Sequence, residues 1–189
     1  MTRASNGDAL AGTTATFFGF NLILNGSFEI DTAGPPAGWT STGSSGNPPK
    51  AYDATSRSVA PAPLGNNVAG WDSLTTTYSG RGALSSCFAI PTGNGAVVSA
   101  SFRSGAGAPT LRLTFHIYTT ADCSGTDTAI PESSGTPAST TAWASHSFSR
   151  TSAQLGTTTS GVSARVEIQA HSNATGDIAY FDNVVVNLQ

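Results

Sequence analysis

Two carboxylates lie in short motifs at opposite ends of the patterned part of this chain. Glu29 ends the motif NGSFE at residues 25–29, and Asp182 lies within YFDNV at residues 180–184. Both lie on or beside apolar, strand-like segments, where a charge is costly unless another group pairs with it. A strand that opens a domain can lie beside the strand that closes it, so Glu29 and Asp182 can share one hard cation. The sequence therefore predicts a structural calcium site here; the alternative is that each carboxylate caps a local turn.

Polar and apolar side chains alternate in two further segments, residues 110–119 and 162–171. The outward-facing side chains of the first are Arg112, Thr114, His116 and Tyr118, and those of the second are Arg165, Glu167, Gln169 and His171. Planar polar groups beside an aromatic ring can bond sugar hydroxyls while the ring stacks on the sugar. We therefore predict Arg112, His116 and Tyr118 as ligand-binding residues, with Arg103 as a further candidate. The alternative is that these are ordinary solvated strand faces.

Trp71 is the tryptophan that we select as a stacking platform for a sugar ring. It lies in residues 40–80, a poorly patterned stretch rich in glycine and proline, and long loops of this kind often carry function. Trp39 and Trp143 are expected to anchor the core or its rim. The alternative for Trp71 is the same, because large aromatic side chains are usually buried.

The acidic residues do not suggest an enzyme. The chain has three glutamates: Glu29 is assigned to the metal site, Glu132 lies in a loop rich in proline, serine and threonine, and Glu167 lies on a strand face. Glycoside hydrolysis requires two carboxyl groups across a cleft, and the sequence does not mark such a pair. The chain has no Gly-x-Ser-x-Gly nucleophile motif, and its three histidines do not have the spacing of a zinc site. We therefore expect a non-catalytic protein.

The two cysteines, Cys87 and Cys123, are predicted to form a disulfide between a strand and a loop. Such a bond indicates an oxidising compartment, and we expect an extracellular or cell-surface location. The alternative is a pair of free, buried thiols. No apolar run approaches membrane-spanning length, so membrane insertion is not expected.

Composition and turn residues predict one all-β domain, an antiparallel two-sheet β-sandwich. The 21 glycines and 10 prolines divide the chain of 189 residues into short apolar runs. The expected strands are residues 21–29, 82–90, 96–103, 110–119, 144–151, 162–171 and 177–188, with 71–78 as a weaker candidate. Residues 1–20 are expected to form a flexible arm, and residues 21–189 the single domain. The net charge of -3, without a basic run, argues against a nucleic-acid partner.

The order of these motifs resembles β-jelly-roll carbohydrate-binding modules of the galactose-binding-like class, which are attached to bacterial secreted proteins. The resemblance covers about residues 21–188 and includes both end motifs, Cys87 and the segment around Cys123. It implies a non-catalytic module that binds a glycan or polysaccharide, with Glu29 and Asp182 helping to hold a structural calcium.

An alternative is a structural or adhesive surface protein that self-assembles through its N-terminal arm. Phe17, Phe18 and Phe20 would then add to the sheet edge of a neighbouring copy.

Overall fold

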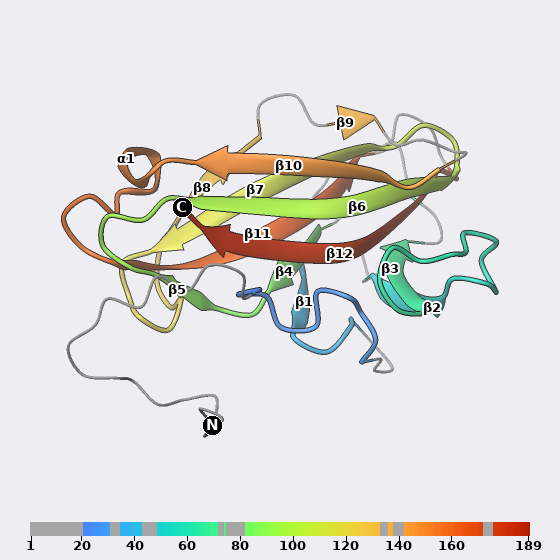
Figure 1. The fold of residues 1–189 in the computed structure, drawn as a ribbon, viewed down its shortest axis with the longest axis horizontal. Helices are drawn as coiled ribbons and strands as arrows, with labels where there is room; N and C mark the ends of the chain where they lie inside the picture. The colour runs from blue at the N-terminus through green and yellow to red at the C-terminus, as the bar shows by residue number, and fades with distance from the viewer. Residues whose placement is uncertain are drawn as a thin grey trace, which may run out of the picture.

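The computed structural model describes residues 21–30, 35–42, 49–71, 74, 82–132, 136–137, 142–171 and 176–189. Two antiparallel β-sheets pack against each other in this part of the chain, so the predicted all-β sandwich is confirmed (Figure 1). The arm predicted for residues 1–20 lies outside the described residues. No helix in the described ranges is both long and apolar enough to span a membrane.

The first sheet has seven strands, and β11 lies at its centre, between β4 and β7. Its strands are β1 (Trp39–Thr42), β4 (Gly82–Ser85), β5 (Phe88–Ile90), β7 (Thr110–Tyr118), β8 (Asp127–Pro131), β9 (Thr136–Pro137) and β11 (Val162–His171). The path runs β1-β4-β11-β7-β8, while β5 also pairs with β11 and β9 with β7. Between β4 and β5, the Ser85 hydroxyl accepts the Val166 N–H at 3.0 Å and so replaces a missing ladder bond.

The second sheet has five strands in the order β10-β6-β12-β3-β2. They are β2 (Lys50–Asp53), β3 (Asn67–Trp71), β6 (Ala96–Ala106), β10 (Ala144–Arg150) and β12 (Ile178–Leu188). In Figure 1 this sheet lies toward the viewer, with β6 and β12 crossing the centre of the picture. One short helix, α1 (Ser152–Leu155), follows β10 and is capped by Thr151.

The alternating apolar side chains of both sheets meet in one core. The predicted inward-facing residues Leu111, Leu113 and Phe115 of β7 are at most 1% exposed, and Val166 and Ile168 of β11 are equally buried. Phe102 and Phe181 face them from the second sheet, as members of the same cluster. A smaller cluster covers the other side of the second sheet, formed by Ala54, Val59, Val68 and Tyr180.

The strand predicted for residues 21–29 is wrong, because this segment forms turns. Asn25 and Phe28 have positive φ angles of 52° and 56°, which interrupt an extended chain. The segment nevertheless lies along β12, since the Leu22 N–H bonds Val186 O at 3.1 Å and the Val184 N–H bonds Gly26 O at 2.8 Å. Residues 22–26 are therefore adjacent to the last strand, as the prediction required.

The pairing of β7 with β11 joins the two polar faces that the sequence suggested separately. His116 lies opposite Arg165, and Arg112 lies opposite Gln169, so both sets of polar side chains share one face. We call this face, on the side away from the core, the polar face. Arg103 does not belong to it, because Arg103 lies on β6 in the other sheet.

Candidate functional site

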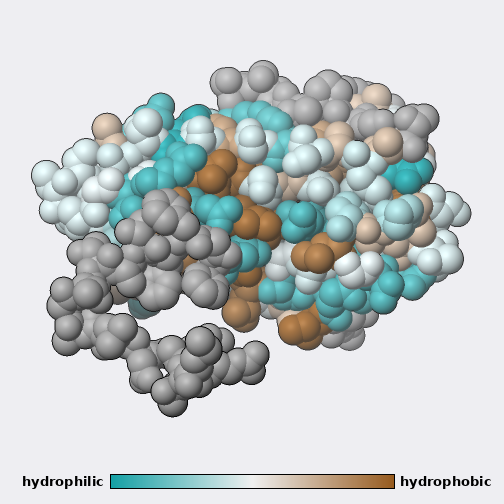
Figure 2. Space-filling model, viewed as in Figure 1, coloured by the Kyte–Doolittle hydropathy of each residue, from teal (hydrophilic) through white to brown (hydrophobic). Residues whose placement is uncertain are grey.

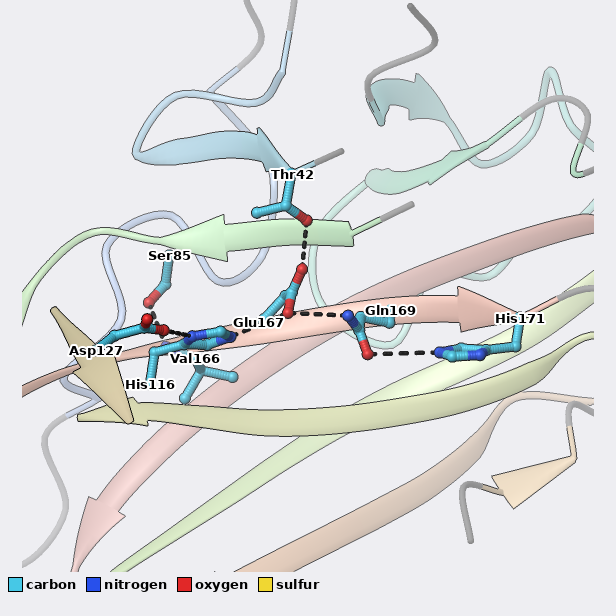
Figure 3. Close-up of polar contacts among 8 residues, drawn as sticks. All are labelled: Thr42, Ser85, His116, Asp127, Val166, Glu167, Gln169 and His171. Atoms are coloured by element: carbon cyan, nitrogen blue, oxygen red, sulfur yellow. Dashed lines mark hydrogen bonds and ion pairs between the residues drawn. The ribbon is translucent and has the colours of Figure 1, made fainter. Parts of the chain in front are cut away.

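His116 joins two carboxylates on the polar face (Figure 3). Its Nδ1 bonds Asp127 Oδ2 at the start of β8, and its Nε2 bonds Glu167 Oε2 on β11 at 3.0 Å. An ionised carboxylate accepts and does not donate hydrogen bonds, so with both acids ionised the two ring nitrogens donate and His116 is an imidazolium. Burial lowers the pKa of His116, but the bonds to Glu167 and Asp127 outweigh it, and the pKa lies above its ordinary value.

Glu167 bonds three side chains of this arrangement and is only 5% exposed. Its Oε1 accepts the Thr42 hydroxyl of β1, and its Oε2 accepts the Gln169 amide at 2.9 Å as well as His116. Burial raises the pKa of Glu167, but the hydrogen bonds from His116 and Thr42 outweigh this and leave the pKa below its ordinary value. Gly82 makes room for the carboxylate, because a Cβ there would collide with Glu167 Oε1 and Thr42 Oγ1.

The chain of contacts continues along β11 to His171. Gln169 Oε1 lies 3.4 Å from His171 Nε2, so the amide bonds Glu167 on one side and His171 on the other. Burial and then the charge of Arg112 lower the pKa of His171 to about 4, so this ring is neutral at pH 7. We call the connected residues the Glu167 network: Thr42, His116, Asp127, Glu167, Gln169 and His171.

Sequence reasoning missed two members of this network. Asp127 and Thr42 come from β8 and β1, which were not among the predicted strands. Asp127 lies opposite Tyr118 in the pairing of β8 with β7. Tyr118 is two residues along β7 from His116, so Asp127 and His116 share one face of the sheet. A search for a hairpin partner to residues 110–119 beyond the cysteine loop would have found it.

The predicted disulfide between Cys87 and Cys123 is present, with Cα atoms 5.8 Å apart. It holds the loop after β7 against β11, where the Cys123 N–H bonds the Ser163 hydroxyl at 3.2 Å. Tyr118 lies opposite Ser163 and is only 7% exposed. Its ring therefore offers little area for stacking on a sugar, contrary to its predicted role.

The prediction that Trp71 is a loop platform is wrong. Trp71 is the last residue of β3, is 2% exposed and packs edge-on against Phe181, with ring centroids 5.1 Å apart. It belongs to the main core, and its ring cannot reach a ligand on either outer face. Arg112 and His116, by contrast, are partly exposed on the polar face.

Glu29 lies in a second cluster of polar contacts, beside the second sheet. Its Oε1 accepts the backbone N–H groups of Asn66 and Asn67 at 2.9 and 2.7 Å. Gly65, with a φ of 78°, allows this approach, because a Cβ there would collide with the Glu29 carboxylate. The carboxylate thus fixes the loop that precedes β3.

Asp182 bonds the same loop from β12. Its Oδ2 accepts the Leu64 N–H at 2.7 Å, and its Oδ1 accepts the Asn183 N–H at 2.6 Å, where β12 has a bulge. Asp182 is fully buried, and burial raises its pKa to about 7, with a further contribution from the charge of Glu29. The two predicted calcium ligands therefore lie close enough to repel each other electrostatically. No group of three or more His, Cys, Asp or Glu side chains with metal-site geometry occurs in the described segments.

The outer surface on this side of the molecule is mixed in character. Figure 2 shows brown apolar side chains lying among teal and white polar ones over the second sheet. The large apolar residues most exposed in the described chain are Leu24, Ile30 and Leu64.

Comparisons with known proteins agree on the fold. No family model and no curated protein match the sequence. Among solved structures, TmCBM61 in complex with β-1,4-galactotriose is 13% identical, with a TM-score of 0.51, over 90% of this chain and all of that chain. The CBM22-1 xylan-binding domain of Paenibacillus barcinonensis Xyn10C is 12% identical, with a TM-score of 0.55, over 86% of this chain and 90% of that one.

A third similar structure comes from a larger protein. The enzymatically active domain of bacteriophage CBA120 tailspike protein 4 is 15% identical, with a TM-score of 0.54, over 89% of this chain but 21% of that chain. Identities this low show the fold and no more. The chain has the β-sandwich fold of the jelly-roll carbohydrate-binding modules.

Proposed function

We propose that the protein is a non-catalytic carbohydrate-binding module that binds a glycan on the polar face. The observation that carries this proposal is the Glu167 network, which fixes an imidazolium, a carboxylate and an amide side by side. Such preorganised planar groups can bond the hydroxyls of a sugar without first being ordered. Arg112 lies opposite Gln169 and adds a guanidinium to the same row.

The similar structures support a glycan partner. TmCBM61 forms a complex with β-1,4-galactotriose, and the CBM22-1 domain is a xylan-binding domain. The disulfide supports an oxidising, extracellular or cell-surface location. His116 is an unsuitable general base, because both of its ring nitrogens already bond carboxylates.

We further propose that Glu29 and Asp182 help to hold a structural calcium ion. A buried carboxylate whose pKa is raised to about 7 is costly to ionise, and a hard cation would remove that cost. The donor set fits, because both side chains offer oxygen atoms beside one loop. The cation would link that loop to β12 and would act on stability.

The proposed function is tested with a glycan array followed by titration calorimetry on any glycan that binds. Arg112→Ala and Gln169→Ala should each weaken binding by roughly tenfold or more, since each removes hydrogen bonds to the ligand. Arg103→Ala is the matched control, because Arg103 lies on the other sheet. Unchanged affinity in both polar-face variants, or no binding across the array, would overturn the proposal.

A further inference from the structure

Arg165 is a cation on the polar face that the Glu167 network does not use. It lies on β11 directly opposite His116 and is partly exposed. Its Nε is buried from solvent and has no hydrogen-bond partner among the described residues. A buried guanidinium N–H without an acceptor is costly, and a rotation of the side chain toward a ligand acceptor would remove that cost.

The carboxylates near Arg165 already have a different partner. Glu167 and Asp127 both form ion pairs with His116. No described carboxylate lies within ion-pair distance of Arg165. The guanidinium charge therefore remains available to a bound molecule.

The balance of charge on this face is positive, although the whole chain carries -3. Arg112, Arg165 and the His116 imidazolium face the two carboxylates of Glu167 and Asp127, which leaves one positive charge. The Arg112 charge adds to burial in lowering the pKa of His171 to about 4. At Tyr118, burial and then Asp127 raise the pKa, and the Arg165 charge opposes them.

We propose that the polar face selects an acidic glycan, one whose sugars carry a carboxylate or sulfate group, and that Arg165 binds this group. The proposal rests on the proposed function, because it names the class of glycan for that same surface. A guanidinium forms paired N–H···O bonds with a planar oxyanion, and such charge-assisted bonds are stronger than bonds to neutral hydroxyls. Arg165 thereby sets specificity, while Arg112 and Gln169 on the same face bond the neutral hydroxyls of the same sugar chain.

The test uses two matched pairs of oligosaccharides that differ in charge alone. The first pair is tetragalacturonate and its methyl ester, and the second is a κ-carrageenan tetrasaccharide and its desulfated form. Dissociation constants are measured by calorimetry in low salt for the intact chain and for Arg165→Gln. We expect the acidic member of one pair to bind roughly tenfold more tightly than its neutral counterpart, and Arg165→Gln to remove that preference.

The preference is a ratio within one variant, so a small loss of stability in Arg165→Gln does not affect it. Arg103→Gln is the matched control and should keep the preference, because the Arg103 Nε is also buried without a partner but lies on the other sheet. The pair that shows the preference identifies the carboxylate or the sulfate as the group bound. A preference that survives in Arg165→Gln would overturn this inference.

The outcomes also separate this inference from the proposed function. Binding of neutral glycans alone, or equal binding within both pairs, would overturn the selection for acidic glycans and leave the glycan-binding function standing. No binding of any glycan in the array or in the two pairs would overturn both.

Discussion

Glu167 and Asp182 are both buried carboxylates, but they lie on different sheets and have different kinds of partner. Glu167 bonds the His116 imidazolium, and its pKa lies below the ordinary value. Asp182 bonds the backbone N–H groups of Leu64 and Asn183, and its pKa is raised to about 7. One negative charge is neutralised by a side chain of the protein, whereas the other has no cationic partner among the described residues.

This difference indicates different functions for the two regions. Because its charges are already matched, the Glu167 network can hold its groups in fixed positions and present them to a ligand. The site at Asp182 and Glu29 holds two carboxylates near each other, and the proposed cation would offset their repulsion and so add stability. The first region is suited to recognition and the second to stabilising a loop.

The largest effect expected is that of removing His116. In His116→Ala, Glu167 loses its cation and keeps a buried charge, so we expect a loss of about 3 kcal/mol in unfolding free energy at pH 7. Urea unfolding measures this loss. The control is His171→Ala, which removes a ring that is neutral at pH 7 and should cost much less. Equal losses in the two variants would show that the charge of His116 is unimportant.

Removal of calcium is expected to have the next largest effect. At a free calcium concentration one hundred times the dissociation constant, binding contributes about 2.7 kcal/mol, or roughly 5–10 °C in melting temperature. A chelator should remove this contribution from the intact chain but not from Asp182→Asn. Glu167→Gln, which also neutralises a buried carboxylate, should keep its sensitivity to the chelator. An intact chain that melts at the same temperature with chelator, and holds no metal, would contradict the calcium proposal.

The pH dependence of stability should differ between the two regions, with a maximum for the His116–Glu167 pair and a fall with rising pH for Asp182. The raised pKa of His116 adds stability at low pH that is lost as pH rises through that pKa, and the lowered pKa of Glu167 adds stability that is lost as pH falls through that pKa. The contribution of this pair should therefore be largest between roughly pH 4.5 and 6.5. His116→Ala should lose this maximum in unfolding experiments across pH, and a variant that keeps it would argue against the ion pair.

Asp182 should behave differently in the absence of metal. Its raised pKa means that stability present at low pH is lost as pH rises toward 7. In chelator, Asp182→Asn should therefore lose less stability between pH 4 and 7 than the intact chain. A smaller effect is expected here than for His116→Ala, since backbone N–H groups partly stabilise the carboxylate. Parallel pH profiles for Asp182→Asn and the intact chain would show that the pKa of Asp182 is not raised.

The sequence correctly predicted the strands that have one apolar face and one polar face. Residues 162–171 alternate because one face meets the core and the other meets water, and β11 has these bounds. β3 was missed because it is covered on both sides: Val68 lies in the small outer cluster and Trp71 in the main core. A strand buried on both faces has no alternation, so Trp71 was assigned to a loop.

The candidate site could not be predicted from the alternation of side chains along single strands, because it also depends on which strands pair. Alternation placed Arg112 and Gln169 on outward faces, but only the pairing of β7 with β11 shows that they share one face. The turn at residues 25–26 was visible, because Asn-Gly is a strong turn signal, and it explains why residues 21–29 do not form a strand. The apolar run before it outweighed that signal in the prediction.

The most direct test of the account is amide chemical-shift mapping with an oligosaccharide that the array identifies. If the polar face is the binding surface, the largest shifts should fall on β7 and β11, around Arg112, His116 and Gln169. Amides of β6 and β12, on the other sheet, should change little. Shifts concentrated on β6, β12 or residues 53–66, with β7 and β11 unchanged, would contradict the assignment of the polar face as the glycan-binding surface.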